Sequence, residues 1–376
     1  MTILAWDSVV LLANLLVSLR VGMGGFLLAF YALIGAAGAA EVSRELQVPQ
    51  EWIEGAKREG KVIVYGSETP QEANAIHRGF SQRYPFIAVE YIKAATVVRF
   101  EKVLFAAKQG KPTADLVTAI GGSTAAYVDA GVLMDLVNLP VWNSYSKEQK
   151  LHGKYLAGPF VRYWSLAYNT NLVPKGQAPA SWEDLFQPKW KGRIAANSIT
   201  RSVSFTPLWY AWGAERATKF LEGLVANGFQ VRKEGHEASL RLLEAGEYSI
   251  LTTAGEYQVY TDQGKGAPVE WVALDPVPTT SGGLVGALKD APHPNALRLY
   301  VNWLLSEEGQ RAYSQPTNTF PVHPRLGDLT PNFKDWPKRM AGKRKAIRTL
   351  EHEYEATKPG GSEVGKAWNR LVLKGL

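Results

Sequence analysis

The sequence predicts an α/β protein made of two doubly wound α/β lobes that are joined by two crossover strands. Three observations support this prediction. Short β-type runs alternate with helical patterns after residue 41, and a second alternating series begins after residue 174. Long extended runs at 160–174 and 269–288 lie between the two series and after the second. Repeated β-α units of this kind favour parallel, doubly wound sheets.

The first series contains three β-α units. The strands are expected at 61–67, 88–94 and 114–120, and the helices at 70–84, 96–110 and 121–131. Ligands of such sheets bind beyond the carboxyl ends of the strands, so three loops should converge there. These loops end in polar residues, namely Ser67 and Glu68, Thr96, and Ser123.

The first of these loops precedes a helix with a strong start signal. Thr69 and Glu72 have the spacing of a capping box, and Pro70 occupies the first helical position. Ser67 and Glu68 lie between strand and helix, where exposed backbone N–H groups can hold a ligand. The competing interpretation is that this segment only caps the helix.

The second series alternates in the same way between residues 181 and 255, and a helix at 294–309 then returns to the first lobe. Helical spacing places Ala296, Tyr300, Trp303 and Leu304 on one face of that returning helix. The expected ranges are a signal peptide at 1–40, lobe 1 at 41–158, lobe 2 at 159–280, and the rest of lobe 1 with a C-terminal helical extension at 281–376. The crossovers near 162–168 and 277–284 should act as a hinge.

The N-terminus resembles a secretory signal. An apolar stretch from Met23 to Ala40 follows Arg20 and ends in small residues that suit signal peptidase. The mature chain should therefore begin near Ala40 or Glu41, in the periplasm or outside the cell. The alternative is an uncleaved helical anchor, because 18 apolar residues only just span a bilayer.

Composition excludes several kinds of site. The chain has no cysteine, so disulfides, thiolate metal sites and cysteine catalysis are absent. The net charge of +7 comes partly from a basic cluster at 334–348, which we interpret as a solvated helix rather than a nucleic-acid site. The sequence contains no P-loop and no G-x-S-x-G, G-x-G-x-x-G or H-E-x-x-H motif. The six histidines are scattered along the sequence, and we predict that they are ordinary surface or loop residues.

Four stretches carry a family resemblance. They are "GKVIVYGS", "AYNTNLVP…SWEDLFQPKWKGRIA", "LEAGEYSILTTAGEY" and "APHPNALRLYVNWLLSEEGQRAY". In this order they resemble the extracellular solute-binding proteins of ABC importers, in the branch that includes ferric-ion binders. The resemblance covers roughly residues 50 to 325. It implies the type II periplasmic binding protein fold, a small solute bound between the lobes, and delivery to the transmembrane subunits of an ABC permease. We expect a monomer with no nucleic-acid partner, and no cofactor other than Fe³⁺ as a transported ligand.

The resemblance also implies ligand residues in lobe 2. Ferric-ion binders carry a Tyr-Tyr pair that falls here on Glu256 and Tyr257, so the first tyrosine is replaced. Carboxylate and phenolate are both hard oxygen ligands, and the two residues are candidate metal ligands. Arg162 lies on the first crossover, where iron-binding relatives often carry arginine, and Arg201 begins a lobe 2 helix.

Two hypotheses about the solute follow, and a third concerns enzymes. A cationic or metal-containing ligand would offset Glu68 and Glu256 if both face the cleft. An anionic organic solute would instead be held by Arg162, Arg201 and the N–H groups after Gly66. An enzyme on the same bilobed fold is a further alternative, because fold does not fix function.

Overall fold

The computed structural model describes residues 44–94, 98–329, 333, 335–358 and 361–373. The chain divides into two units, of which the first contributes only residues 44–47 to the description and the second begins at Val48. All that follows concerns the second unit. The expected signal peptide and Thr96 lie outside the described residues. Within the described ranges, no helix has the length and apolar character needed to cross a bilayer.

Lobe 1 is built on a four-stranded sheet of order β12-β3-β1-β2. The strand β1 (Lys61–Gly66) pairs in parallel with β2 (Ala88–Lys93) and β3 (Leu116–Val117), whereas β12 (Gly286–Ala287) returns antiparallel to β3. Its helices are α2 (Gln50–Glu59), α3 (Pro70–Arg83), α4 (Val103–Lys108), α5 (Thr124–Asp129), α10 (Pro294–Leu305) and α11 (Glu307–Thr317). A small hairpin of β4 (Lys150–Leu151) and β5 (Tyr155–Leu156) precedes the first crossover.

Lobe 2 shares a larger sheet with the crossovers. Its order is β14-β11-β6-β9-β7-β8, and β10 and β13 pair separately with β6. The strands are β6 (Phe160–Asn169), β7 (Ile194–Ala196), β8 (Gln230–Val231), β9 (Ile250–Gly255), β10 (Val269–Val272), β11 (Val277–Ser281), β13 (Phe320–Pro321) and β14 (Lys345–Arg348). Its helices are α6 (Thr206–Trp212), α7 (Ala214–Ala226), α8 (His236–Ala245), α9 (Glu256–Gln263), α12 (Trp336–Met340) and α14 (Glu363–Trp368). The helix α13 (Leu350–Thr357) lies against α5 and β4 of lobe 1.

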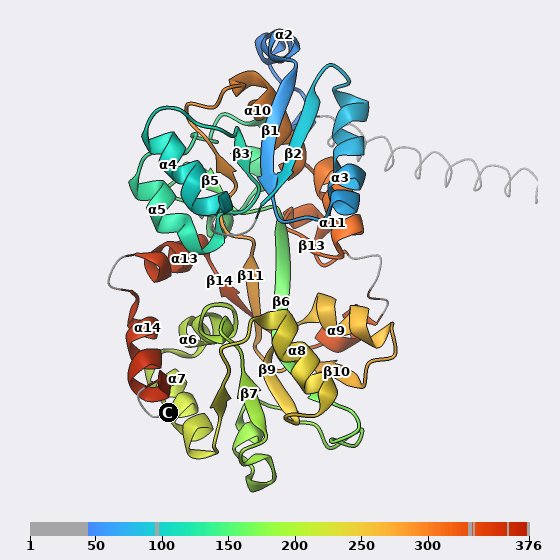
Figure 1. The fold of residues 1–376 in the computed structure, drawn as a ribbon, viewed down its shortest axis with the longest axis vertical. Helices are drawn as coiled ribbons and strands as arrows, with labels where there is room; N and C mark the ends of the chain where they lie inside the picture. The colour runs from blue at the N-terminus through green and yellow to red at the C-terminus, as the bar shows by residue number, and fades with distance from the viewer. Residues whose placement is uncertain (1–43, 95–97, 330–332, 334, 359–360, 374–376) are drawn as a thin grey trace, which may run out of the picture. The chain divides into compact units, whose positions relative to one another are not determined.

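The two crossovers lie side by side. The ten-residue strand β6 runs from the lobe 1 region into the lobe 2 sheet, and β11 pairs with it antiparallel from Thr279 to Ser281 (Figure 1). Both crossovers are where the sequence predicts them. The fold class, two α/β lobes joined by crossover strands, is confirmed.

Local signals correctly place several elements. The capping box at the start of α3 is formed, since Thr69 Oγ1 accepts from the Glu72 N–H and the Glu72 carboxylate accepts from the Thr69 N–H. The predicted apolar face of α10 is fully covered, with Ala296, Tyr300, Trp303 and Leu304 each no more than 1% exposed. Burial of such a stripe, rather than helix propensity, supplies most of the helix's stability.

The C-terminal segment differs from the expected arrangement. The basic cluster is not one solvated helix, because it is split between α12 and the strand β14. Lys334 lies outside the described residues, and four of the other six basic residues form ion pairs, namely Arg339, Arg344, Lys345 and Arg348. The sequence predicts that residues 281–376 belong to lobe 1 with its helical extension, but Val364, Ala367 and Trp368 are buried in the lobe 2 core. Apolar residues in α14 cause this, since they complete the hydrophobic cluster around α7.

Candidate ligand-binding site

The first loop of lobe 1 contains a carboxylate held by two tyrosines. Glu68 is 6% exposed, and its oxygens accept hydrogen bonds from Tyr91 Oη at 2.8 Å and Tyr313 Oη at 2.5 Å. These bonds tie the loop to β2 and α11. Glu68 is therefore a buried structural group rather than an exposed ligand residue. The neighbouring Ser67 is exposed, as expected.

Gly66 is required by this arrangement, and a substitution tests it. A Cβ atom at Gly66 would lie 2.1 Å from Glu68 Oε2 and 2.6 Å from Tyr91 Oη. Gly66→Ala should therefore lower the free energy of unfolding by about 1–3 kcal/mol, as overpacking does. Gly122→Ala is the matched control, because nothing lies within 4 Å of a Cβ there. Urea unfolding of both variants measures the two changes in stability. Equal unfolding midpoints would contradict the close packing around Gly66.

The remaining loop and lobe 2 candidates do not all come together. Ser123 is half-buried at the end of a short 3₁₀ turn, just before α5. Arg201 is exposed at the start of a π-turn, and its Nη1 lies 2.9 Å from the position of a Cβ on Gly365 of α14. The Arg201 side chain thus lies toward the C-terminal segment. Arg162, Glu256 and Tyr257 are the three candidates that the structure does bring together.

Arg162 is the centre of this cluster. Side chains alternate along a strand, so Phe160, Arg162 and Trp164 project from the same face of β6. The guanidinium carbon of Arg162 lies 3.6 Å from the centre of the Tyr257 ring and 4.9 Å from that of Phe160. Its Nη1 is buried and has no hydrogen-bond partner among the described residues. A desolvated cationic donor of this kind is costly unless something pairs with it.

Glu256 lies beside Arg162 but is only partly satisfied. It is fully buried, and its Oε2 accepts the Tyr163 N–H at 2.9 Å, whereas Oε1 has no partner within the described part of the chain. Burial raises the pKa of Glu256 to about 8, against a smaller lowering effect of Arg162. The carboxyl group is therefore mostly protonated at neutral pH and contributes little negative charge beside Arg162.

Tyr257 has a similar constraint. Burial raises the pKa of its phenol, and the adjacent Arg162 only partly offsets that effect. A ferric–phenolate bond needs the deprotonated oxygen, so burial opposes the form that a metal would require. Within the described ranges, no group of three or more His, Asp or Glu residues could hold a metal ion. Glu256 and Tyr257 are thus adjacent, as predicted, but the pair is not preset as an anionic metal site.

His236 belongs to the same cluster, and the interpretation of the histidines as surface residues was wrong for it. Its ring lies 5.3 Å from Trp164 and 5.7 Å from Tyr257, and it is 9% exposed. Neither ring nitrogen has a hydrogen-bond partner in the described structure. Burial first, and then Arg162, lower the pKa of His236 to about 4, so the ring is neutral at pH 7. Its position at the start of α8 gave no sequence signal.

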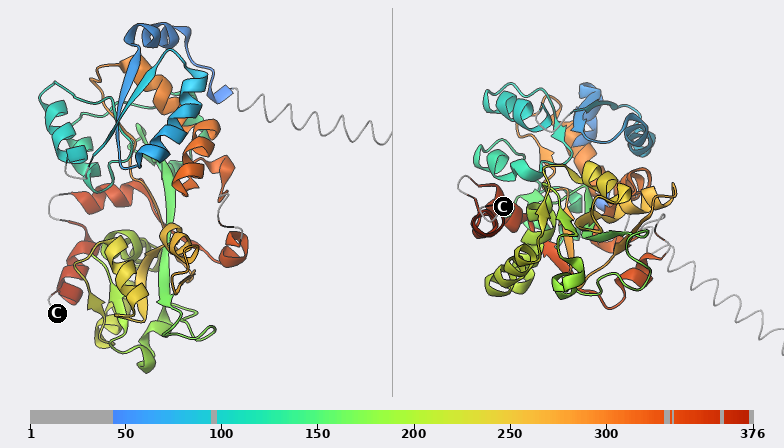
Figure 2. Two further views of the ribbon diagram at one scale, coloured as in Figure 1. Left: turned by 45° about the vertical axis from the view of Figure 1, so that its right-hand side comes forward. Right: turned by 60° about the horizontal axis from the view of Figure 1, so that its bottom comes forward.

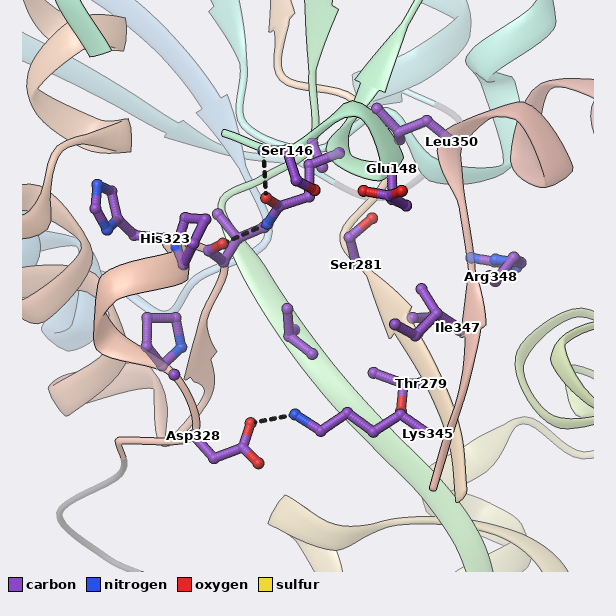
Figure 3. Close-up of a pocket in the computed structure, with 18 of the residues that line it drawn as sticks. Ser146, Glu148, Thr279, Ser281, His323, Asp328, Lys345, Ile347, Arg348 and Leu350 are labelled. Carbon is purple, nitrogen blue, oxygen red and sulfur yellow. Dashed lines mark hydrogen bonds and ion pairs between the residues drawn. The ribbon is translucent and has the colours of Figure 1, made fainter. Parts of the chain in front are cut away.

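A separate cavity lies on the other face of β6. It has a volume of about 390 Å³ and is lined by alternate β6 residues, Val161 and Tyr163, together with residues of β11, β13 and β14 (Figure 3). Its charged groups are already paired, since Lys345 Nζ lies 2.7 Å from Asp328 Oδ1 and Tyr163 Oη also donates to that carboxylate. The Arg162 face, with its unpartnered donor, is therefore the better candidate for binding a solute.

These features indicate the class of protein to which the chain belongs. Two α/β lobes joined by two crossover strands are the architecture of a bilobed solute-binding protein. The sequence profile of the family described as bacterial extracellular solute-binding proteins matches residues 75–341, and the chain belongs to that family. Proteins of this kind bind a small solute outside the cytoplasm, in the periplasm, and work with the permease subunits of an ABC importer.

Three relatives illustrate the range of the family. An uncharacterized protein of Haemophilus influenzae is 26% identical over 272 residues, which cover 68% of this chain and 75% of that protein. Iron uptake protein A2 of Synechocystis is 30% identical over 162 residues, covering 39% and 46%. A putative 2-aminoethylphosphonate-binding periplasmic protein of Salmonella typhi is 27% identical over 191 residues, covering 47% and 54%. The last two alignments thus span only about half of each relative.

A solved structure confirms the fold. Iron-bound HitA from Pseudomonas aeruginosa superposes with a TM-score of 0.61 at 20% identity, and the alignment covers 84% of this chain and 99% of that one. Identity at this level establishes a shared fold and says nothing about a shared ligand.

Proposed function

We propose that this protein binds a small organic anion, of the phosphonate, phosphate-ester or carboxylate type, at Arg162 and delivers it to an ABC permease. The supporting observation is the half-buried Arg162, whose buried Nη1 has no partner among the described residues and lies beside groups that burial keeps neutral. Arginine binds planar or tetrahedral anions through parallel N–H bonds and is the preferred residue for such recognition.

The aromatic rings around Arg162 add to the proposal. Stacking on Tyr257 and Phe160 holds the planar guanidinium in one orientation, so less rotational freedom is lost when an anion binds. The Salmonella relative is named as a binder of a phosphonate, which carries such a group. Phe160, Arg162 and Tyr257 then form one wall of the site, and Ser67 and Ser123 are candidate contacts from lobe 1.

The ferric alternative rests on different residues and is less well supported. It would need Glu256 and Tyr257 to lose protons next to each other, although burial raises the pKa of both groups. Arg162 would then serve to hold an accompanying anion. Because two similar proteins are named for iron, the ligand panel below also tests this alternative.

We also propose that the protein has no catalytic activity of its own, acts as a monomer and does not bind nucleic acid. The family consists of binding proteins, and the ion pairs of Arg339, Arg344, Lys345 and Arg348 occupy much of the basic cluster. Charges that already have partners contribute little to attraction of a polyanion.

A ligand panel distinguishes the two solutes. Thermal unfolding is followed with 2-aminoethylphosphonate, inorganic phosphate, citrate or ferric citrate. A ligand at 100 times its Kd should stabilise the protein by about 2.7 kcal/mol, so a true ligand is easily seen. We expect one of the iron-free anions to raise the midpoint, and ferric citrate to give no absorption band beyond that of free ferric citrate. A charge-transfer colour with ferric citrate that Tyr257→Phe abolishes would overturn the proposal in favour of iron.

A further inference from the structure

The chain continues beyond the family match into a segment that contacts both lobes. The match ends at residue 341, and the elements β14, α13 and α14 follow it. The strand β14 pairs in parallel with the crossover strand β11, from Val277 opposite Lys345 to Thr280 opposite Arg348. The connection between the lobes therefore contains a third strand beside β6 and β11 (Figure 1).

One end of this segment is anchored in lobe 2. Val364, Ala367, Trp368 and Val372 are each at most 5% exposed within the core cluster that also contains α7. The Trp368 ring lies 5.7 Å from that of Phe205. Burial of several large apolar side chains is worth several kcal/mol in total, so this end should stay attached to lobe 2.

The middle of the segment contacts lobe 1 through polar groups. Tyr354 Oη donates to Asp129 Oδ1 of α5 at 2.6 Å, and Thr357 Oγ1 accepts the Ala125 N–H at 3.0 Å. The Tyr354 ring also lies 4.8 Å from His152, next to the lobe 1 hairpin. Ala125 is near the start of α5, where the N–H groups have no partner inside the helix. Figure 2 shows α13 next to α5, with α14 continuing beside lobe 2.

The same short helix also contacts lobe 2. The His352 ring stacks on Tyr210 of α6 at 3.5 Å. Arg348 pairs with Glu353 at 2.5 Å, both side chains being at most 8% exposed, and Arg348 Nη1 donates to Ser202 Oγ at 2.6 Å. The helix α13 is thus held on one side by α5 and on the other by α6 and the turn before it.

We propose that residues 345–357, here called the C-terminal latch, connect the two lobes. The latch is followed by the buried lobe 2 anchor at 364–372, and it binds α5 of lobe 1 through Tyr354 and Thr357. Any change in the angle between the lobes moves α5 relative to α6, so it must break or shift the grip of Tyr354 and Thr357. The latch therefore limits the range of interlobe angles, and it adds to the restriction that the hinge strands impose. The grip is polar and partly exposed, which makes it reversible, whereas the anchor is apolar and buried. The proposal does not depend on which solute is bound.

Distance measurement between spin labels tests the latch without any ligand. The chain has no native cysteine, so Gln109→Cys in lobe 1 and Glu222→Cys in lobe 2, both exposed, give two specific labels. In this background, Tyr354→Phe/Thr357→Val removes the two hydroxyls that grip α5 and keeps the volume of both side chains. We expect the distance distribution to become at least twice as broad.

A matched control removes similar hydroxyls within lobe 2. Tyr260→Phe/Thr261→Val deletes a tyrosine–aspartate bond to Asp335 and a bond to the Tyr257 carbonyl. Its distribution should remain as narrow as that of the parent. Asp129→Ala deletes the Tyr354 contact from the lobe 1 side and should broaden the distribution, even if the first variant fails to fold. Unchanged widths in the folded latch variants, or equal broadening in the control, would overturn the proposal.

Discussion

Replacing Arg162 by methionine should weaken binding of the anionic solute by roughly 30- to 1000-fold, because loss of a buried charged partner costs about 2–4 kcal/mol. Methionine keeps the aliphatic bulk between Phe160 and Tyr257 and removes only the charge and donors. Isothermal titration with the anion found in the ligand panel measures the loss.

Two further variants make this prediction specific. Arg162→Lys keeps the charge but loses the flat stacking surface and paired donors, so its affinity should lie between wild type and methionine. Arg216→Met removes an exposed arginine that is paired with Glu183 in the same lobe, and its affinity should stay within about twofold of wild type. Equal affinities for Arg162→Met and Arg216→Met would show that Arg162 does not contact the solute.

Glu256→Gln should remove most of a pH dependence of stability. The pKa of Glu256 is raised in the folded protein from 4.5 to about 8, so the native state holds a proton that the unfolded chain releases. The associated stability is fully present below pH 4.5 and is lost as the pH rises through about 8. This loss amounts to up to about 5 kcal/mol in the wild type, and glutamine, which does not titrate, should not show it.

The measurement compares two proteins across pH. Urea unfolding of wild type and Glu256→Gln at pH 5, 7 and 9 should give similar stabilities at pH 5 and a clear advantage for glutamine at pH 9. Comparing the two chains cancels the effects of other groups, including His77 and His236, whose pKa values burial lowers to about 4. A constant difference across this range would mean that Glu256 is ionised throughout, and it would restore Glu256 as an anionic ligand candidate.

The parts of the structure that sequence predicts well depend on neighbouring residues. The capping box of Thr69 and Glu72 spans four positions, and the buried face of α10 repeats within twelve. The crossover β6 is a long extended run with its own β propensity. Patterns of this length are complete within one segment, so the sequence carries them without knowledge of the fold.

The parts that sequence missed depend on distant partners. The bond from Tyr313 to Glu68 joins residues 245 positions apart, and it changes Glu68 from an exposed candidate into a buried structural group. His236 is buried because α8 packs near Trp164 of β6, which no local pattern shows. The strand β14 is short and basic, and only its pairing with β11 makes it a strand.

The candidate site has features that the sequence predicts and others that depend on distant partners. Arg162, Glu256 and Tyr257 were selected from the sequence and are adjacent in the structure, but their charge states could not be predicted. Burial sets the protonation of Glu256, and burial is a property of the assembled lobe. Resemblance to ferric binders favoured a metal at this position, whereas the geometry around Arg162 favours an anion.

Native mass spectrometry with elemental analysis identifies what the site around Arg162 holds. Wild type and Arg162→Met are purified side by side from the exported fraction, without added ligand. We expect wild type to retain a small organic anion that is released on denaturation, and Arg162→Met to carry none. Stoichiometric iron in the wild type, or the same bound mass on both proteins, would contradict this expectation.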